Sequence, residues 1–222
     1  IHRRMGGRLE VAVFDKTASN PAAHIGEAIA LFSEKAPDVS LQMHVAAIPA
    51  IERGLMDGSF HLGIIPAHRS SQSLVYANLF TETMLLYCGA RHPLFGQEHA
   101  GLDWDGLRAW QFAGLGYHSP NMELSHGARL PRKATGFDQE SIATLILSGR
   151  YLGFLPDHYA EAFERQGLMQ AVQPAQFFYR CQFVSVLRRS PQPPRAAQAF
   201  AQCLLEAHLT ASNANGSDDR GR

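Results

Sequence analysis

Three side chains that can hydrogen-bond a small anion follow a short alternating apolar run: Thr17, Ser19 and Asn20. Asn20 stands directly before Pro21. Asn is a favoured N-cap and Pro suits the first helical position, so we expect a helix to begin here. The free N–H groups and the positive dipole end of such a helix suit a carboxylate or another anion. Because the same side chains can serve as caps alone, ligand contact and capping remain two open readings.

Further candidates stand where other expected strands end. Ile48 and Pro49 lie at the next strand–helix turn, and Pro66 and His68 follow the third apolar run. A histidine here can hydrogen-bond a small ligand or change its charge near neutral pH. The competing readings are local turn packing for the other three residues and a solvated loop position for His68.

The second half of the chain offers a matching set, which consists of Tyr117, Phe137, Asp138 and Phe154. Aromatic walls with a few polar groups are what a small organic ligand needs. Phe154 is the exception, because apolar residues in such strands are usually buried and its core reading is the stronger one.

Catalytic and metal-binding patterns find no support in the sequence. The 11 histidines are scattered and form no H-x-x-x-H, H-E-x-x-H or Cys/His cluster. Neither a G-x-S-x-G elbow nor a Gly-rich phosphate loop occurs. We therefore expect no metal, no cofactor and no enzymatic activity.

The balance of charged residues bears on whether this chain binds DNA. The 222 residues include 20 Lys and Arg against 20 Asp and Glu, and a DNA-binding module needs an excess of basic side chains. We therefore expect this chain not to hold DNA by itself.

The three cysteines, Cys88, Cys181 and Cys203, form no C-x-x-C pair and are expected to be buried thiols of a cytoplasmic protein. We find no apolar run long enough for a membrane span and no leader, and the chain starts at Ile1, as a processed or partial chain would.

The elements that would position these residues alternate between strand and helix. Residues 9–13, 39–45 and 62–65 alternate or run apolar as strands, with helices after Asn20 and Pro49, which predicts a parallel sheet with helices on both faces. A second strand–helix–strand unit spans Gly136–Pro156, with Gly149 just past the helix end. Two longer strands, near 83–87 and 182–187, are expected to cross between two lobes.

The fold class that follows is α/β, with two Rossmann-like lobes joined by two crossing strands. We expect a linker remnant at 1–7, lobe I at 8–86 plus 184–209 and lobe II at 87–183. Residues 210–222 lack apolar anchors and are expected to be disordered. A cleft between such lobes is a common place for a small ligand.

The ordered set of motifs resembles the effector-binding domain of LysR-type transcriptional regulators. The segments that carry the resemblance are Gly7–Val13, Phe32–Leu41, Leu55–Ile64, the His92-Pro93-Leu94 turn and Ser148–Pro156. Together they cover about residues 7–209. Two departures are His61, where the family usually has Asp, and Arg150-Tyr151 before the glycine of the last segment.

The resemblance implies a fold like type 2 periplasmic binding proteins and a small-molecule effector in the interlobe cleft. It further implies homodimers or tetramers, and a winged helix-turn-helix before Ile1 that receives the conformational change and binds DNA. Some family members sense peroxide through a cysteine pair. Residues 116–135 hold no cysteine here, and a disulfide between Cys88 and Cys181 on the crossing strands stays open.

Two other functions compete with this reading. A periplasmic solute-binding protein of the same fold would need an export signal or a lipid-anchor cysteine. A small α/β enzyme would turn over whatever compound stabilises it. The sequence names neither the effector nor the direction of regulation.

Overall fold

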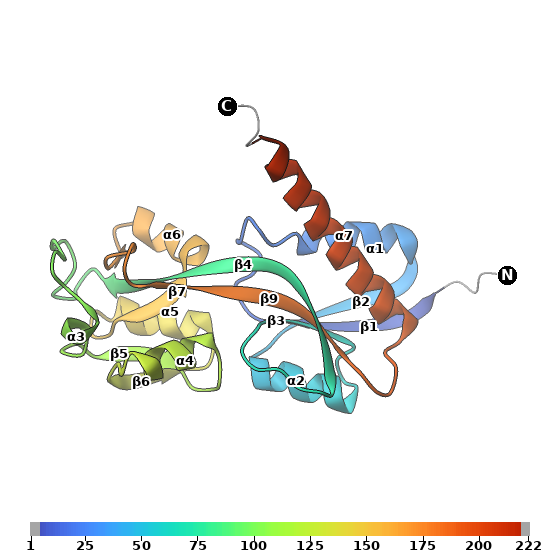
Figure 1. Ribbon diagram of the computed structural model, residues 1–222, viewed down its shortest axis with the longest axis horizontal. Helices are drawn as coiled ribbons and strands as arrows, with labels where there is room; N and C mark the ends of the chain where they lie inside the picture. Colours follow the sequence, from blue (N-terminus) through green and yellow to red (C-terminus); the bar gives the residue numbers. More distant parts are fainter. Residues whose placement is uncertain (1–4, 219–222) are drawn as a thin grey trace. The chain divides into compact units, whose positions relative to one another are not determined.

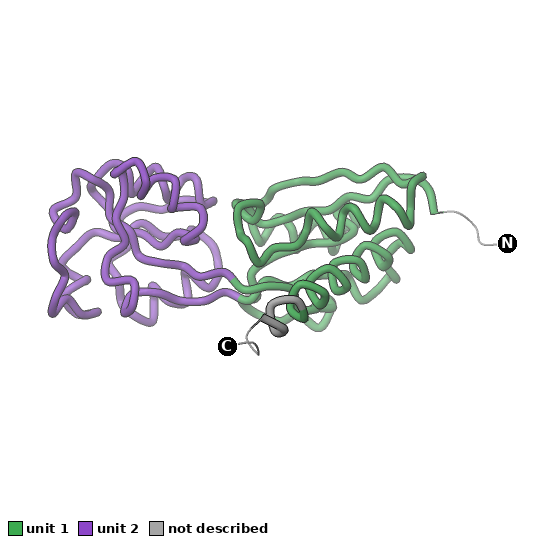
Figure 2. The backbone as a smooth tube through the Cα atoms, turned by 90° about the horizontal axis from the view of Figure 1, so that it is seen from above, with its two compact units in different colours: residues 1–81, 182–222 green, residues 82–181 purple. Residues whose placement is uncertain are grey.

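The computed structural model describes residues 5–218, with the side chains of 214–218 left out. The chain divides into two compact units, residues 1–81 with 182–222 and residues 82–181 (Figure 2). The boundaries fall inside two long strands, β4 (Leu74–Gly89) and β9 (Phe178–Arg188), so the chain passes between the units twice. The expected boundaries were 86/87 and 183/184, a few residues away on the same two strands.

The first unit is built around the parallel strands β1 (Gly6–Val13), β2 (Asp38–Val45) and β3 (Leu62–Pro66). The strand β1 lies between the other two, and Val11 is in register with Met43 on one side and Leu62 on the other. The strand β3 then pairs antiparallel with β9, opposing Ile64 to Ser185. All five residues of β3 are buried, as a central strand covered on both faces requires.

Helices cover both faces of this sheet (Figure 1). The helices α1 (Ile25–Lys35) and α7 (Arg195–Asp218) pack against each other on one face, and α2 (Ile48–Asp57) covers the other. Phe32 and Phe200 meet edge to face, with ring centroids 5.4 Å apart. Each such buried aromatic side chain contributes about 1.5–3 kcal/mol of transfer free energy relative to exposure.

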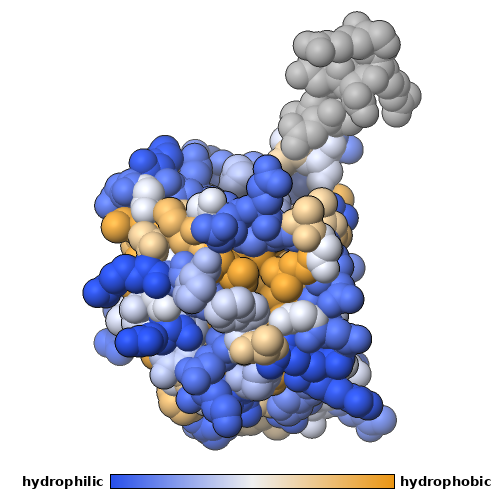
Figure 3. Space-filling view, turned by 90° about the vertical axis from the view of Figure 1, so that its left-hand side faces the viewer, coloured by the Kyte–Doolittle hydropathy of each residue, from blue (hydrophilic) through white to orange (hydrophobic). Residues whose placement is uncertain are grey.

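The second unit repeats the strand–helix pattern on a smaller scale. Its remaining elements are α3 (Trp104–Leu107), β5 (Phe112–Leu115), α4 (Pro120–Gly127), β6 (Arg132–Gly136), α5 (Gln139–Leu147), β7 (Gly153–Pro156), α6 (Asp157–Arg165) and β8 (Met169–Ala171). The strands β5 and β6 run parallel, and β7 pairs antiparallel with β4. The helix α5 packs on β5, β6 and β7. In the space-filling view that faces this unit, an apolar area lies within a mostly hydrophilic surface (Figure 3).

Three local expectations were wrong. The first helix begins at Ile25 instead of after Asn20, because Asn20 Oδ1 accepts the N–H of Ala22 in a tight turn. The strand β1 starts at Gly6, within the expected linker, where Gly6 is in register with Asp38. The strand β4 starts at Leu74, well before the expected crossing strand near 83–87.

The expected disordered tail is also wrong over its first part, because α7 continues to Asp218. Thr210 Oγ1 and Ser212 Oγ donate to the carbonyls of Glu206 and His208 one turn earlier, which extends the helical bonding. Ile1–Arg4 of the expected linker and residues 219–222 of the expected tail lie outside the described residues.

Candidate functional site

The first unit brings its candidate turns to one edge of the sheet, because β1, β2 and β3 are parallel and end there. Phe14 N donates to Ile64 O at 2.9 Å and Ala46 N donates to Val13 O at 3.2 Å, so the three strand ends are held side by side. Thr17 and Asn20 are buried and Ser19 is exposed in the turn after β1. Pro66 is the buried last residue of β3.

Asn20 is engaged by the fold at both polar ends of its side chain. Its Oδ1 accepts from Ala22 N at 2.9 Å, and its Nδ2 donates to Thr81 O at 3.2 Å. Thr81 is the last residue of β4 within the first unit. Asn20 therefore fixes the turn after β1 to the crossing strand.

Ile48 and Pro49 belong to the first turn of α2. Ile48 is fully buried, and Pro49 occupies an early helical position where its missing N–H costs nothing. The N-cap residue, Ala47, makes no side-chain capping bond.

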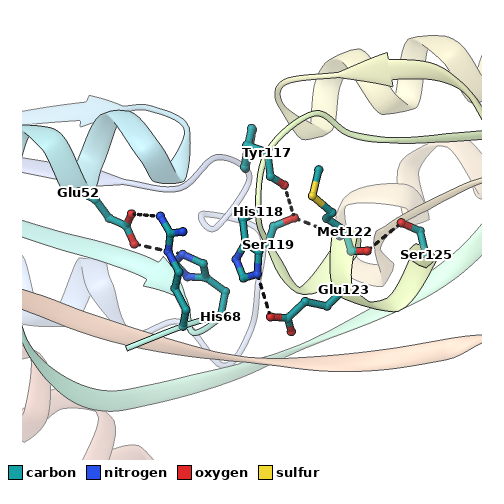
Figure 4. A network of polar contacts seen from close by, with 9 residues as sticks. Glu52, His68, Tyr117, His118, Ser119, Met122, Glu123 and Ser125 are labelled. Atoms are coloured by element: carbon teal, nitrogen blue, oxygen red, sulfur yellow. Dashed lines mark hydrogen bonds and ion pairs between the residues drawn. The ribbon is translucent and has the colours of Figure 1, made fainter. Parts of the chain in front are cut away.

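His68 lies in a small polar cluster after β3. Its side chain is 1% exposed, and its Nε2 lies 3.1 Å from Glu52 Oε1 on α2. Arg69 NH2 lies 3.5 Å from the other oxygen of the same carboxylate. Figure 4 shows Glu52 directed at His68. The Glu52 carboxylate thus holds two basic side chains of the turn after β3.

A cavity of about 380 Å³ opens beside this cluster. Its lining residues are Ala67, His68, Arg69, Ser70, Tyr76, Asn78 and Val184. A larger cavity of about 810 Å³ shares Arg69, Ser70 and Tyr76 with it and includes Pro49 and Glu52. The structure therefore brings His68 and Pro49 to cavities of the first unit, while Thr17, Ser19, Ile48 and Pro66 line neither.

The second unit places its candidates where β5 and β6 end side by side. Gly116 N donates to Gly136 O at 2.9 Å, which joins the two turns. A Cβ on Gly116 would meet the ring of Phe137 at 2.7 Å, so the Phe137 ring lies against this backbone while remaining 63% exposed. Tyr117 follows Gly116 directly in the chain and is partly buried.

Two helix caps shape these turns. Asp138 caps α5 by accepting from Ser141 N at 2.7 Å. Ser119 caps α4 by accepting from Met122 N at 3.2 Å, and its own hydroxyl donates to Tyr117 O. Figure 4 shows this chain of contacts continuing to Ser125, with His118 pointing to Glu123. The turn Tyr117–Ser119 is consequently held by its own helix.

Phe154 belongs to the core of the second unit. It has no exposed surface, and its ring meets Tyr179 at 5.2 Å and Phe112 at 6.0 Å between centroids. This packing favours the core reading of Phe154 over contact with a ligand.

Sequence reasoning missed a buried polar network beneath the Tyr117 turn. Asn121 Oδ1 accepts from Leu115 N at 3.0 Å, and Asn121 Nδ2 donates to the hydroxyl of Tyr179 on β9 at 3.4 Å. Burial holds the pKa of Tyr179 well above its usual value, so it remains a neutral phenol. Nearby, Glu82 and His158 form a buried pair at 2.8 Å. No local signal marks these residues, because their partners lie 58 and 76 positions apart in the sequence.

One departure from the family pattern has a structural explanation. His61 Nδ1 accepts the N–H of Glu10 at 3.0 Å, and His61 N donates to Glu10 O at 2.8 Å. An aspartate oxygen at this position would also be an acceptor, so His61 satisfies the same backbone group on β1. Nothing in the structure explains Arg150-Tyr151.

The three cysteines all lie among the residues that the structure describes. Cys88, Cys181 and Cys203 are all free and buried, so no disulfide joins the crossing strands. Burial raises the pKa of the Cys88 thiol to about 11 and raises that of Cys181 further. Among the described helices none combines the length and apolar character that a bilayer crossing demands.

Comparison with known proteins identifies relatives of the whole chain. The HTH-type transcriptional activator BauR of Pseudomonas aeruginosa is 26% identical over 204 residues, which cover 92% of this chain and 67% of BauR. The solved effector-binding domain of QuiR in complex with shikimate superposes with a TM-score of 0.75 at 12% identity, covering 93% of this chain and 99% of that domain. The cofactor-binding domain of the Cbl transcriptional regulator gives a TM-score of 0.70 at 18% identity, covering 92% and 90%.

The sequence also matches the family described as the LysR substrate binding domain, over residues 2–209. The match spans both units and all the strand-end turns described above. This chain therefore belongs to the LysR substrate-binding domain family, the ligand-sensing part of LysR-type transcriptional regulators.

Proposed function

We propose that the effector of this regulatory domain is a small organic anion that contacts the His68–Arg69 turn of the first unit. The observation that carries the proposal is the lining of the 380 Å³ cavity, which contains two basic residues and three neutral hydrogen-bonding residues (Ser70, Tyr76 and Asn78). The carboxylate that pairs with both basic residues, Glu52, lines the adjoining cavity and not this one. A volume of this size suits a small metabolite, since ligand pockets are commonly about 300–1,000 Å³.

The solved relatives are consistent with this class of ligand. The QuiR domain is described in complex with shikimate, and the CcmR regulatory domain of Synechocystis PCC6803, with a TM-score of 0.69, in complex with 2-PG. In the first unit the exposed Ser19 hydroxyl would add a polar contact. In the second unit Tyr117 and Phe137 remain proposed aromatic contacts of a ligand. Thr17, Asn20, Ile48, Pro66 and Asp138 would shape the turns through burial or capping.

Thermal unfolding with pairs of small carboxylic acids and their primary amides tests the anionic class. An acid that binds should stabilise the domain by about 2.7 kcal/mol at a concentration of 100 Kd, whereas its amide should not. Stabilisation by an amide as large as that by its acid would contradict the anionic class.

Two variants test whether the turn after β1 also contacts the ligand. Ser19→Trp fills the exposed turn after β1, and Ser33→Trp places the same bulk on an exposed position of α1 away from the turns. A stabilising acid found in the panel should lose affinity for the first variant and keep it for the second. Equal affinity for both would exclude the turn after β1 from the site.

The parent protein is proposed to be a cytoplasmic regulator that binds DNA as a dimer or tetramer through an N-terminal helix-turn-helix. The support is the family membership together with full-length relatives, among them CbnR in complex with its target DNA. An effector would act by favouring one state of the domain, and coupling of about 1–3 kcal/mol is typical. Sequencing the coding region before Ile1 separates this regulator from a solute-binding protein, since an export signal there would contradict it.

A further inference from the structure

His208 on α7 is a buried histidine that neither the effector turns nor the family match accounts for. His208 is 6% exposed, and each of its two ring nitrogens contacts a backbone atom. Nδ1 lies 2.7 Å from Leu204 O on the same helix, and Nε2 lies 3.0 Å from the backbone nitrogen of His24. The second contact joins positions 184 residues apart and ties the segment before α1 to the C-terminal helix.

The partners fix the protonation state of the ring. A carbonyl oxygen only accepts, so Nδ1 carries the hydrogen, and a backbone N–H only donates, so Nε2 carries none. His208 is therefore a neutral imidazole in this fold. A second proton would have to enter at Nε2, and it would remove the acceptor that the His24 N–H uses.

The surroundings oppose that second proton. Burial is the largest influence and lowers the pKa of His208 below its ordinary value of 6.5; nearby His24 lowers it further, whereas the Leu204 bond and Glu27 on α1 raise it. Phe80 on β4 stacks against the ring with centroids 5.5 Å apart and brings no charge. A cavity of about 510 Å³ lined by both histidines gives protons a route from solvent.

The segment held by His208 continues into the turn after β1. Ala23 N donates to Asn20 O at 3.0 Å and Ala22 N donates to Asn20 Oδ1 at 2.9 Å, so residues 20–23 form one bonded turn directly before His24. Asn20 in turn holds Thr81 of β4. Release at His24 would loosen the end of this turn from its C-terminal anchor.

We propose that His208 is a proton-operated latch: its neutral ring fastens the backbone of His24 to α7, and protonation at Nε2 releases the segment of residues 22–24, while the bond from Asn20 to Thr81 still holds the turn after β1. Protonation of His208 would make the attachment of this segment to α7 depend on pH, whether or not an effector is bound. The released segment directly follows the Thr17–Asn20 turn that we also propose for the effector site, so acidification would loosen the chain next to that turn without a ligand.

The sign of the pH dependence follows from the lowered pKa. Above about pH 6.5 both the folded and the unfolded chain carry neutral His208, and the latch contributes fully. As the pH falls below that value the unfolded chain binds the proton first, so the contribution is lost progressively until the folded pKa has been passed. Acid, and not alkali, opens the latch.

Nuclear magnetic resonance on the ¹⁵N-labelled 222-residue chain tests the ring directly. The expected result is the tautomer with hydrogen on Nδ1, and a titration midpoint for His208 below the ordinary histidine value of 6.5. The tautomer with hydrogen on Nε2, or a midpoint at or above 6.5, would overturn the proposal. This measurement needs no variant and does not depend on whether a substitution folds.

Amide hydrogen exchange at His24 and Ala22 tests the release. After correction for the intrinsic rate, exchange in the wild type should quicken between about pH 7.5 and about pH 5.5, by about tenfold for each pH unit below the unfolded pKa. His208→Gln keeps a donor and an acceptor without titrating and should remove this dependence. His24→Gln retains the backbone N–H and should preserve it, as should His126→Gln.

The outcomes separate the latch from its alternatives. An unchanged pH dependence in His208→Gln would overturn the proposal, and so would its loss in His24→Gln, which would assign the titration to His24. Another buried histidine, His92, whose pKa burial also lowers, lies in the second unit and should leave exchange at His24 unaffected.

Discussion

Polar side chains at the strand-end turns differ in what they are bonded to. Asn20 and Ser119 each use both polar functions within the fold, as cap, turn bond or tie to another strand. His68 and Arg69 instead share one carboxylate and line a cavity. The residue type alone does not separate these roles, because Asn, Ser and His are equally able to serve a ligand or a backbone group.

The Glu52 cluster yields a prediction at the residue scale. Glu52→Gln removes the negative charge that His68 and Arg69 share, and it should lower the free energy of unfolding by about 1–3 kcal/mol, the range for hydrogen bonds to charged groups. Because Arg69 is 61% exposed, most of this loss should come through His68. Urea unfolding at neutral pH measures it. Glu34→Gln, at an exposed position of α1, is the control and should change little; equal losses in both variants would show that the cluster has no special role.

At the scale of elements, a polar residue followed by proline begins a helix at one position and only a turn at another. Ser119-Pro120 begins α4 as a cap followed by proline, whereas Asn20-Pro21 begins only a turn. The difference is the hydrogen bond that the side chain makes: Ser119 reaches the N–H three residues on, and Asn20 the N–H two residues on. Asn competes with helical bonding through such short turns, so its place before proline is an ambiguous helix signal.

The end of α5 was predictable, and it carries the second prediction. Gly149 has φ +72°, and a Cβ there would lie 2.9 Å from the Arg91 carbonyl carbon. Gly149→Ala should therefore cost more than about 1 kcal/mol of unfolding free energy, since both the backbone conformation and the space exclude a side chain. Chemical denaturation measures the cost. Gly127→Ala at the end of α4, where nothing lies within 4 Å, should be neutral or stabilising; a loss as large as at Gly149 would contradict this account.

For the molecule as a whole, the crossing strands decide how the chain is divided. The unit boundaries lie at Thr81/Glu82 and Cys181/Gln182, within β4 and β9. The pattern of strands and helices predicted two lobes with boundaries a few residues from these, because a strand that continues through a boundary carries no break in its pattern. The C-terminal helix likewise continues past the point where apolar residues end.

The buried thiols give a prediction at this scale. Cys88, Cys181 and Cys203 all lie in the core, and burial raises the pKa of each thiol, so the reactive thiolate is scarce in the folded chain. We expect a thiol reagent at neutral pH to label none of the three quickly in the native protein and all three in urea. Mass spectrometry of the labelled chain measures this. A thiol that reacts as fast in the native protein as in urea would show that its part of the core opens readily.

The sequence by itself determined the alternating βα pattern, the helix stop at Gly149 and the family. These features depend on neighbours within a few residues, whose spacing and type the sequence states directly. Only the tertiary structure decided that His61 bonds Glu10, that Glu52 holds His68 and Arg69, that Asn121 reaches Tyr179 and that His208 fastens His24. Such partners are brought together by the packing of whole elements, and the chain distance between them carries no local signal.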